Sequence, residues 1–452
     1  MPTIDERMNA GKSLRKAVPR SSHVEFSRPD SFNAVDLLLS QEEGRLSGLI
    51  PIRRQRMAES AFAFYRAGAK LMAHDLAPTP RTDILVQACG DAHVSNFGWY
   101  GSPERSLVFD VNDFDETLLA TWEWDMKRLA ASFVIAGRDN EFQEKHQTKA
   151  ALAAVRSYQR SMQKFAQEPV LDVWYSHISG QHVLDYLQDE GRTKAAKRAS
   201  KLVRKAERKD SSHVLGKLGE RVNGRYRIAD DSPFVVPIRS PEFAADVGEV
   251  TNIVEQALST YDSTVSHSIR TVVNRFHIID VALKVVGVGS VGTRCFIVML
   301  EGNDPEDILF LQVKQAEASV LEDEFGASSY THAGQRVVEG QRMMQASSDI
   351  MLGWITADTG HEYYVRQYKD MKASVDVGDL DEDDMIKYAR VCGSVLARAH
   401  ARSGDSAAIA GYIGTGDVFG DAISEFAVAY ADQNDVDYSA YLGRMRQMGS
   451  DG

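Results

Sequence analysis

The chain has 452 residues, more than one hydrophobic core normally organises, so we expect two or three domains or lobes. Hydrophobic residues make up 43% of the sequence and charged residues 26%, values that are typical of a globular protein and argue against extensive disorder. The formal net charge of −12 argues against a protein dominated by nucleic-acid binding, because such proteins normally present a net basic surface.

The cysteines and the apolar runs limit the class of protein further. Cys89, Cys295 and Cys392 lie far apart and match no zinc spacing or disulfide framework, so we expect buried thiols. No apolar segment follows the basic residues near the N-terminus, and no uninterrupted apolar run reaches about 18 residues. We therefore expect a cytoplasmic protein with no membrane partner.

The chain begins with about 30 polar residues that include three prolines, and this segment is expected to be loose. Residues 58–73 place apolar side chains on one face at helical spacing and predict a helix. Just before it, Arg53, Arg54 and Arg56 form a basic cluster. This cluster is either a solvated turn or a contact for phosphate.

Polar side chains crowd the stretch around two apolar runs, residues 83–89 and 106–111, which are predicted as buried strands. These side chains are Asp91, His93, Asn96, Asp110, Asn112, Asp113 and Asp115. Carboxylates and amides resist burial unless a cation or hydrogen-bond donors accompany them. Because they fall at strand ends and in the loop between the strands, they predict a functional site that holds a metal.

A helix is predicted over residues 121–138, with Asp125 in its first turns where its carboxylate can accept hydrogen bonds from nearby backbone. Further helix runs to residue 209 and ends in a basic stretch, 192–209, which is either a solvated face or a docking surface. Asn-Gly within 221–228 predicts a hairpin with a type I′ turn. We place the boundary of the first half at 229–245.

The second half starts with a predicted helix at 245–260 and continues with strands at 281–286, 294–300 and 308–316. Three glycines, Gly287, Gly289 and Gly292, lie between the first two strands. A dinucleotide-binding loop would be followed by a helix, and β-branched residues follow instead. Lys314 ends the third strand, where a lysine needs an anionic partner.

The rest of the chain alternates helix and strand before it becomes helical. A helix that carries Glu339 is predicted at 333–346, strands at 350–356 and 362–368, and helices at 383–402 and 417–443. The resulting order is a hairpin around a glycine loop, a strand with a lysine, a helix with a glutamate and two more strands.

This order resembles the small lobe of the protein-kinase-like fold. The resemblance implies that Gly287, Gly289 and Gly292 cover nucleotide phosphates. It also implies that Lys314 contacts phosphate oxygens and that Glu339 orients Lys314. Three other glutamates lie closer to Lys314 in the sequence and remain alternatives to Glu339. They are Glu317, Glu322 and Glu324.

The stretch from residue 89 to 115 resembles the catalytic segment of aminoglycoside and choline phosphotransferases, which carry H-G-D-x-x-x-x-N followed by a strand that ends in a metal-binding Asp. Asp91 and Asn96 keep this spacing, and Asp113 follows the strand. The resemblance implies that Asp91 is the base or hydroxyl-orienting group and that Asn96 and Asp113 bind Mg²⁺. Asp110 is the alternative metal ligand, because it too ends an apolar run, and Cys89 replaces the usual His.

The catalytic segment precedes the glycine loop, which is the reverse of the order in a kinase. We therefore predict an α+β, protein-kinase-like bilobal fold that is circularly permuted, with a small antiparallel-sheet lobe and a mostly helical large lobe. The predicted parts are a loose segment (1–30), a large-lobe portion with the catalytic and metal-binding segment (31–240), a small nucleotide-binding lobe (276–370), and a hinge with the remaining helices (371–452). A second Gly-Asp, at Asp405, lacks the metal ligand, because Ala410 stands where Asn is needed.

Over its whole length the chain also resembles a bacterial family of unknown function that is marked by G-D-A-H-x-x-N-F-G, N-D-F-D-E and W-E-W-D. That resemblance implies no substrate. The kinase-like motifs imply an ATP- and Mg²⁺-dependent phosphotransferase acting on a hydroxyl of an unknown small molecule or protein. The alternatives are an adenylyltransferase, a non-catalytic nucleotide-binding pseudokinase and a metallophosphoesterase, and the last lacks the paired histidines that it normally needs.

Overall fold

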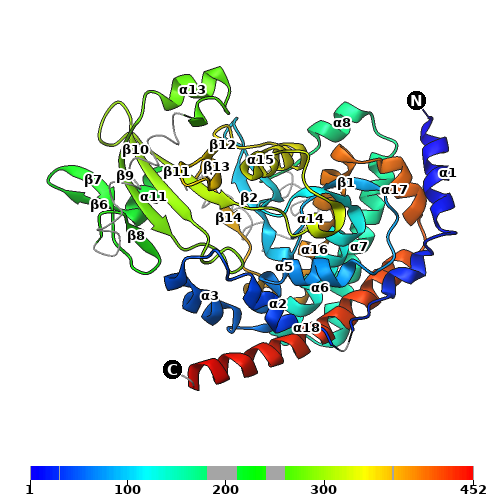
Figure 1. Ribbon diagram of the computed structural model, residues 1–452. Helices are drawn as coiled ribbons and strands as arrows, with labels where there is room; N and C mark the ends of the chain where they lie inside the picture. The colour runs from blue at the N-terminus through cyan, green and yellow to red at the C-terminus, as the bar shows by residue number, and fades with distance from the viewer. Residues whose placement is uncertain (1, 30, 181–210, 241–259, 369–370, 451–452) are drawn as a thin grey trace.

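The computed structural model describes residues 2–29, 31–180, 211–240, 260–368 and 371–450 (Figure 1). Its helices are α1 (Ile4–Leu14), η1 (Arg20–Val24), α2 (Ala34–Ser40), η2 (Ser47–Leu49), α3 (Ile50–Met57), α4 (Ala61–Arg66), α5 (Ala69–Leu76), η3 (Val94–Asn96), α6 (Trp122–Asp139), α7 (Glu144–Phe165), α8 (Val170–Tyr175), α11 (Ser211–Leu218), α13 (His267–Val273), α14 (Glu322–Phe325), α15 (Ala333–Met344), η5 (Val377–Asp379), α16 (Glu382–Ser403), α17 (Ser406–Ile413) and α18 (Val418–Ser450).

The strands of the described residues form four sheets. They are β1 (Leu85–Ala88), β2 (Phe97–Gly101), β3 (Leu107–Val111), β4 (Leu118–Thr121), β5 (Ile178–Ser179), β6 (Gly219–Val222), β7 (Arg225–Ile228), β8 (Val235–Pro237), β9 (His277–Lys284), β10 (Cys295–Glu301), β11 (Ile308–Ala316), β12 (Gly353–Thr356), β13 (Glu362–Gln367) and β14 (Ala373–Ser374). Every pairing among these strands is antiparallel, which confirms the predicted α+β class with antiparallel sheets.

The largest sheet has six strands in the order β12-β13-β11-β10-β9-β8 and stands apart from most of the helices (Figure 1). Successive side chains of a strand point to opposite faces. In β10, Ile297 and Met299 accordingly join an apolar core that includes α11, whereas Val298 and Leu300 join one that includes α13. Since both faces are covered, the central strand β11 is buried along its whole length.

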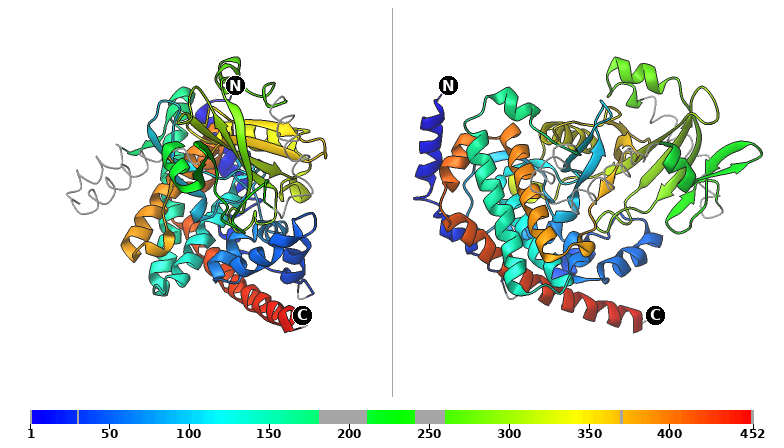
Figure 2. Two further views of the ribbon diagram at one scale, coloured as in Figure 1. Left: turned by 90° about the vertical axis from the view of Figure 1, so that its left-hand side faces the viewer. Right: turned by 180° about the vertical axis from the view of Figure 1, so that it is seen from behind.

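The helices gather around α6, which is buried on nearly all sides and packs against α4, α7, α16 and α18. The two turned views show α18 running along the base of this helical part (Figure 2). The four-stranded sheet β14-β2-β3-β5 and the pair β1-β4 contribute to the same large core. The strands predicted at 83–89 and 106–111 and the helix predicted at 121–138 are confirmed as β1, β3 and α6.

The N-terminal segment differs from the loose segment that was predicted. It forms α1, which begins with a capping box between Thr3 and Glu6 and packs against α17. A Cβ on Gly11 would lie 1.9 Å from the carbonyl oxygen of Ala408, so the two helix backbones are in direct contact. The prediction was wrong because the apolar surface that holds α1 belongs to α17, about 400 residues away in the sequence.

Two predicted boundaries also differ. The helix predicted at 58–73 is divided into α4 and α5, and Gly68 precedes the second. The predicted hairpin is confirmed as β6 and β7, with positive φ at Asn223 (51°) and Gly224 (82°). However, Ile228 packs into the core of the six-stranded sheet, and β8 pairs with β9. Residues 211–240 therefore belong with that sheet and not with the large-lobe portion.

Two predicted helical stretches, 192–209 and most of 245–260, lie outside the described residues. The three cysteines are buried free thiols, as predicted. Asp405, in the second Gly-Asp, caps the N-terminus of α17 through the N–H of Ala408 and pairs with Arg7. Within the described residues, no helix combines the length and the apolar character that crossing a membrane requires.

Candidate functional site

The turn after β1 is held in place by the carboxylate of Asp125 from α6. Its two oxygens accept hydrogen bonds from the backbone N–H groups of Cys89 (2.6 Å) and Gly90 (2.9 Å), as the sequence predicted for this helix residue. Gly90 has φ of +80°, and a Cβ there would lie 2.3 Å from the carbonyl oxygen of Glu116. Only glycine fits this turn, which delivers Asp91 to the site.

His400 and Cys89 also support this turn, in roles that the sequence analysis did not assign to them. His400 of α16 places Nε2 at 3.1 Å from a carboxylate oxygen of Asp125, and its Nδ1 lies 2.9 Å from the hydroxyl of Tyr158. The Cys89 thiol donates to the backbone carbonyl of Asp113 at 3.3 Å. Cys89 therefore links the two polar segments directly, even though it replaces the usual His.

Asp91 is paired with a buried arginine that the sequence analysis did not single out. Arg128 donates from Nε to Oδ1 of Asp91 (2.8 Å), and one of its terminal nitrogens forms an ion pair with the same oxygen at 2.7 Å. The guanidinium lies over the ring of Tyr65. Burial raises the pKa of the Asp91 carboxyl, and Arg128 limits that rise. Oδ2 is the oxygen of Asp91 that Arg128 does not bind. The sequence could have indicated this arginine, because Arg128 follows Asp125 by three residues on the same helix, and side chains at that spacing are neighbours.

Asn96 and Asp113 each keep an oxygen that could coordinate a cation. The Asn96 amide donates to the carbonyl of Asp91 (2.7 Å), and within the described chain its own Oδ1 accepts no hydrogen bond. Oδ1 of Asp113 is buried without a hydrogen-bond partner. Although burial raises the pKa of Asp113, nearby Lys314 and Arg366 lower it, and the net shift is downward. An ionised carboxylate with a buried oxygen that accepts no hydrogen bond from the described residues fits a bound cation.

Asp110, the alternative metal ligand, is fully engaged elsewhere. Both of its carboxylate oxygens lie 2.6 Å from the guanidinium of Arg398 on α16. They also accept the backbone N–H groups of Val111 and Ala346 at 2.9 Å. The alternative assignment of Asp110 as a metal ligand is therefore wrong. Arg398 balances its charge and both of its oxygens already accept hydrogen bonds, so Asp110 is a buried ion-pair partner.

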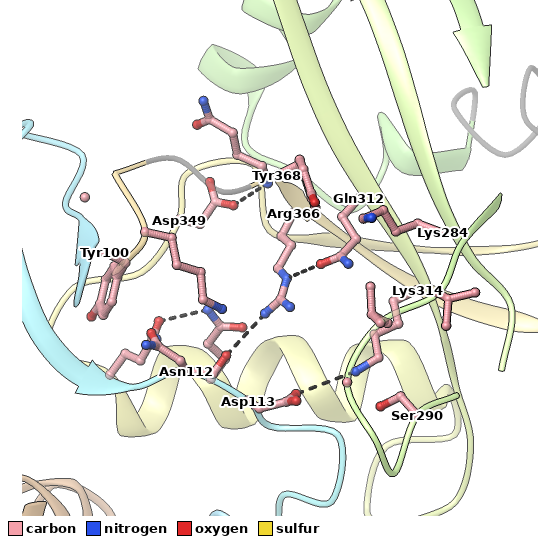
Figure 3. A pocket seen from close by; sticks show the side chains of 18 of the residues that line it. Tyr100, Asn112, Asp113, Lys284, Ser290, Gln312, Lys314, Asp349, Arg366 and Tyr368 are labelled. Carbon is pink, nitrogen blue, oxygen red and sulfur yellow. Dashed lines mark hydrogen bonds and ion pairs between the residues drawn. The ribbon is translucent and has the colours of Figure 1, made fainter. Parts of the chain in front are cut away.

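Lys314 brings the second half of the chain to the first. Its Nζ contacts the carboxylate of Asp115 and lies 3.7 Å from Asp113 (Figure 3). Tyr364 of the neighbouring strand donates to the other oxygen of Asp115 at 2.9 Å. The carboxylate that positions Lys314 is therefore Asp115, an aspartate two residues after Asp113 that was named as polar but given no role.

Glu339 does not pair with Lys314, which corrects the role implied for it. Its carboxylate accepts from Arg342 on the next turn of α15 at 2.9 Å. The three alternative glutamates are also engaged elsewhere, Glu317 with Gln315, Glu322 with the N–H of Ser319 and Glu324 with Arg81. Asp115, from the stretch 89–115, therefore contacts Lys314 in place of the glutamate that was expected from a helix.

The glycine loop lies between the paired strands β9 and β10, as predicted, and residues from the start of the chain hold it. Gly287 and Gly292 have positive φ values of 62° and 96°. Arg56 donates to the carbonyl of Gly287 (2.5 Å), and Arg45 donates to that of Val291 (2.6 Å). Of the basic cluster, Arg53 is buried and Arg54 pairs with Glu42, so the cluster is not a solvated turn.

Two cavities meet at this loop. The first, which we call the distal cavity, measures about 440 Å³ and is lined by polar side chains such as Gln312, Asp349 and Arg366 (Figure 3). The second, which we call the catalytic cavity after the role that the sequence resemblance implies for Asp91, measures about 340 Å³ and contains Asp91 and Asn96. Three residues line both cavities, Asp113, Gly287 and Ser290, whereas Lys314 lines the distal cavity.

Glu116 lines the catalytic cavity and gives it a titratable group near neutral pH. Its Oε2 accepts the N–H of Val320 (2.8 Å), and burial raises the pKa of its carboxyl from 4.5 to about 7. Between these values the folded state keeps a proton that the unfolded chain has lost. As the pH rises through that window, the burial of Glu116 therefore lowers the free energy of unfolding. Above about pH 7 the full loss of stability remains.

We predict that Glu116→Gln raises the free energy of unfolding at pH 8 by about 2 kcal/mol, because the neutral amide has no ionisation cost and still accepts from Val320. At pH 5 the variant and the wild type should differ little. Urea unfolding at the two pH values measures the difference. Equal stabilisation at both would show that titration of Glu116 is not its source.

Residues 45–444 match a family described as an uncharacterized protein conserved in bacteria (DUF2252). The chain belongs to the DUF2252 family. Searches of curated proteins and of solved structures found no match.

The site of this DUF2252 protein is not a dense metal cluster. In the described chain, no group of three or more His, Cys, Asp or Glu side chains is placed to hold a metal ion. Mg²⁺ commonly uses one or two carboxylates and completes its shell with water and phosphate oxygens. Asn96 and Asp113 fit that pattern, whereas a two-metal hydrolase needs more protein ligands than this arrangement offers.

Proposed function

We propose that this DUF2252 protein is an ATP- and Mg²⁺-dependent phosphotransferase with a circularly permuted, protein-kinase-like fold. The observation that carries the proposal is the meeting of two segments about 200 residues apart: Lys314 lies 3.7 Å from Asp113, and the glycine loop borders both cavities beside them. A lysine, a metal-binding carboxylate and a glycine loop at one place are the parts that phosphoryl transfer needs.

The two cavities suggest where the substrates bind. The nucleoside would occupy the distal cavity, where polar side chains can hydrogen-bond to a base and a ribose. The phosphates would pass beneath Gly287 and Ser290, beside Lys314, into the catalytic cavity. Asn96 and Asp113 would hold Mg²⁺, which neutralises phosphate charge when it is bound.

The acceptor hydroxyl would lie at Asp91. As the oxygen of this hydroxyl bonds to the γ-phosphorus, the bond from that phosphorus to the β,γ-bridging oxygen breaks and ADP leaves. The proton of the hydroxyl passes to Asp91. Oδ2 is the suitable oxygen, because Arg128 binds Oδ1. The arginine also reduces the basicity of Asp91, which favours orientation of the hydroxyl over early removal of its proton.

The proposal predicts that purified protein with Mg²⁺ and ATP releases ADP when a library of hydroxyl-bearing metabolites supplies the acceptor. Asp91→Asn should lower the turnover number by roughly 10²–10⁴-fold, because the amide cannot take the proton. Coupled detection of ADP and separate detection of AMP measure the reaction. Release of AMP would indicate adenylyl transfer, and turnover unchanged in Asp91→Asn would contradict the assignment.

A further inference from the structure

Arg66, the last residue of α4, lies in the catalytic cavity and has no role in the function described so far. It lines this cavity together with Asp91, Asn96 and Asp113. A Cβ on Gly289 would lie 3.6 Å from the carbonyl oxygen of Arg66, so the tip of the glycine loop rests against the same turn. Arg66 therefore faces the space between the loop and the catalytic aspartate.

The guanidinium of Arg66 lacks the partner that a largely buried cation needs. Within the described residues it makes no hydrogen bond and no ion pair, and its Nε is fully buried. Burial lowers the pKa of Arg66, while the charges of Asp91 and Asp113 raise it. Removing a guanidinium from water without a partner is costly, so the arrangement calls for an anion in the cavity.

The other cations of the catalytic cavity are already engaged. Arg45 donates to the carbonyl of Val291, and Lys70 pairs with Asp323 at 3.6 Å. Lys314, at the boundary of the cavity, is bound to Asp115. Arg53 is another buried arginine without a hydrogen bond, but it lines neither cavity, and Glu42 lies 3.7 Å from it.

We propose that Arg66 binds the γ-phosphate of the nucleotide, on the side of the catalytic cavity nearest Asp91. This inference rests on the proposed function. A guanidinium presents a planar fork of donors that matches phosphate oxygens, and it stays charged throughout the reaction. Lys314 then contacts phosphates that remain on ADP, whereas Arg66 contacts the group that is transferred.

This division predicts a difference between two nucleotides. In Arg66→Met the dissociation constant for Mg·ATP should rise about tenfold or more, while that for Mg·ADP should change less than about twofold, because ADP lacks the γ-phosphate. Arg66→Lys keeps the charge but not the fork and should give an intermediate rise for Mg·ATP. Titration calorimetry on the full chain measures both constants. Arg156→Met is the matched control, because Arg156 lines neither cavity and pairs with the exposed Asp417.

The outcomes separate the inference from the function on which it rests. Suppose that the wild type binds Mg·ATP and that Arg66→Met and Arg66→Lys bind both nucleotides with the affinity of the wild type. This result would overturn the role of Arg66 and leave the proposed function in place. Equal weakening of Mg·ATP and Mg·ADP in both variants would also overturn it, because the arginine would then only support the loop. Failure of the wild type to bind either nucleotide would overturn the proposed function, and this role with it.

Discussion

Replacing Asp113 by asparagine is expected to lower phosphotransferase turnover by roughly a thousandfold and to leave the free energy of unfolding within about 1 kcal/mol of the wild type. The large loss follows from the position of Asp113 beside Lys314 and from its buried Oδ1, which accepts no hydrogen bond from the described residues. The small change in stability follows because Lys314 keeps its contact with Asp115.

The measurement pairs ADP release with urea unfolding of the same preparation. Asp405→Asn is the matched control, because Asp405 lines neither cavity and an asparagine caps α17 equally well. An Asp113→Asn variant with full turnover would remove Asp113 from the metal site. A variant that unfolds much more easily would show instead that this carboxylate serves the fold.

Replacing Asp110 by asparagine is expected to have the opposite effect, a loss of about 3–5 kcal/mol in the free energy of unfolding. Both partners of its ion pair are buried, with Asp110 1% and Arg398 5% exposed at the side chain. The substitution leaves the Arg398 guanidinium inside the protein without a counter-charge. Breaking a buried pair from one side is among the most destabilising single substitutions.

Urea unfolding of Asp110→Asn beside Asp405→Asn measures this effect. Asp405 also pairs with an arginine, Arg7, but both side chains are 36% exposed, so the control should lose less than about 1 kcal/mol. If Asp110→Asn keeps the stability of the wild type and instead loses Mg²⁺-dependent turnover, Asp110 is the metal ligand after all and the assignment to Asp113 is wrong.

Much of the fold could be predicted because its signals are local. The apolar runs before Asp91 and around Asp110 form strands, and the spacing of apolar residues after Thr121 forms α6. The turn type of the hairpin follows from Asn223 and Gly224 alone. These features depend on neighbouring residues, which the sequence displays directly.

The choice among candidate site residues could not be predicted in the same way. Asp110 and Asp113 both follow an apolar run, and what distinguishes them is Arg398, 288 residues away from Asp110. Likewise, Lys314 is 199 residues from Asp115, the carboxylate that it contacts. Such ion pairs depend on how distant elements pack. The same is true of α1, which packs against α17 from the other end of the chain.

Binding of ATP to the full-length chain, titrated with and without Mg²⁺, tests the central claim most directly, since it requires that the residues of both segments form one nucleotide site. We expect the wild type to bind Mg·ATP, the affinity to fall when Mg²⁺ is removed, and Asp113→Asn to abolish that dependence on Mg²⁺. A wild type that does not bind ATP, or that binds it equally well without Mg²⁺ and in Asp113→Asn, would contradict the account.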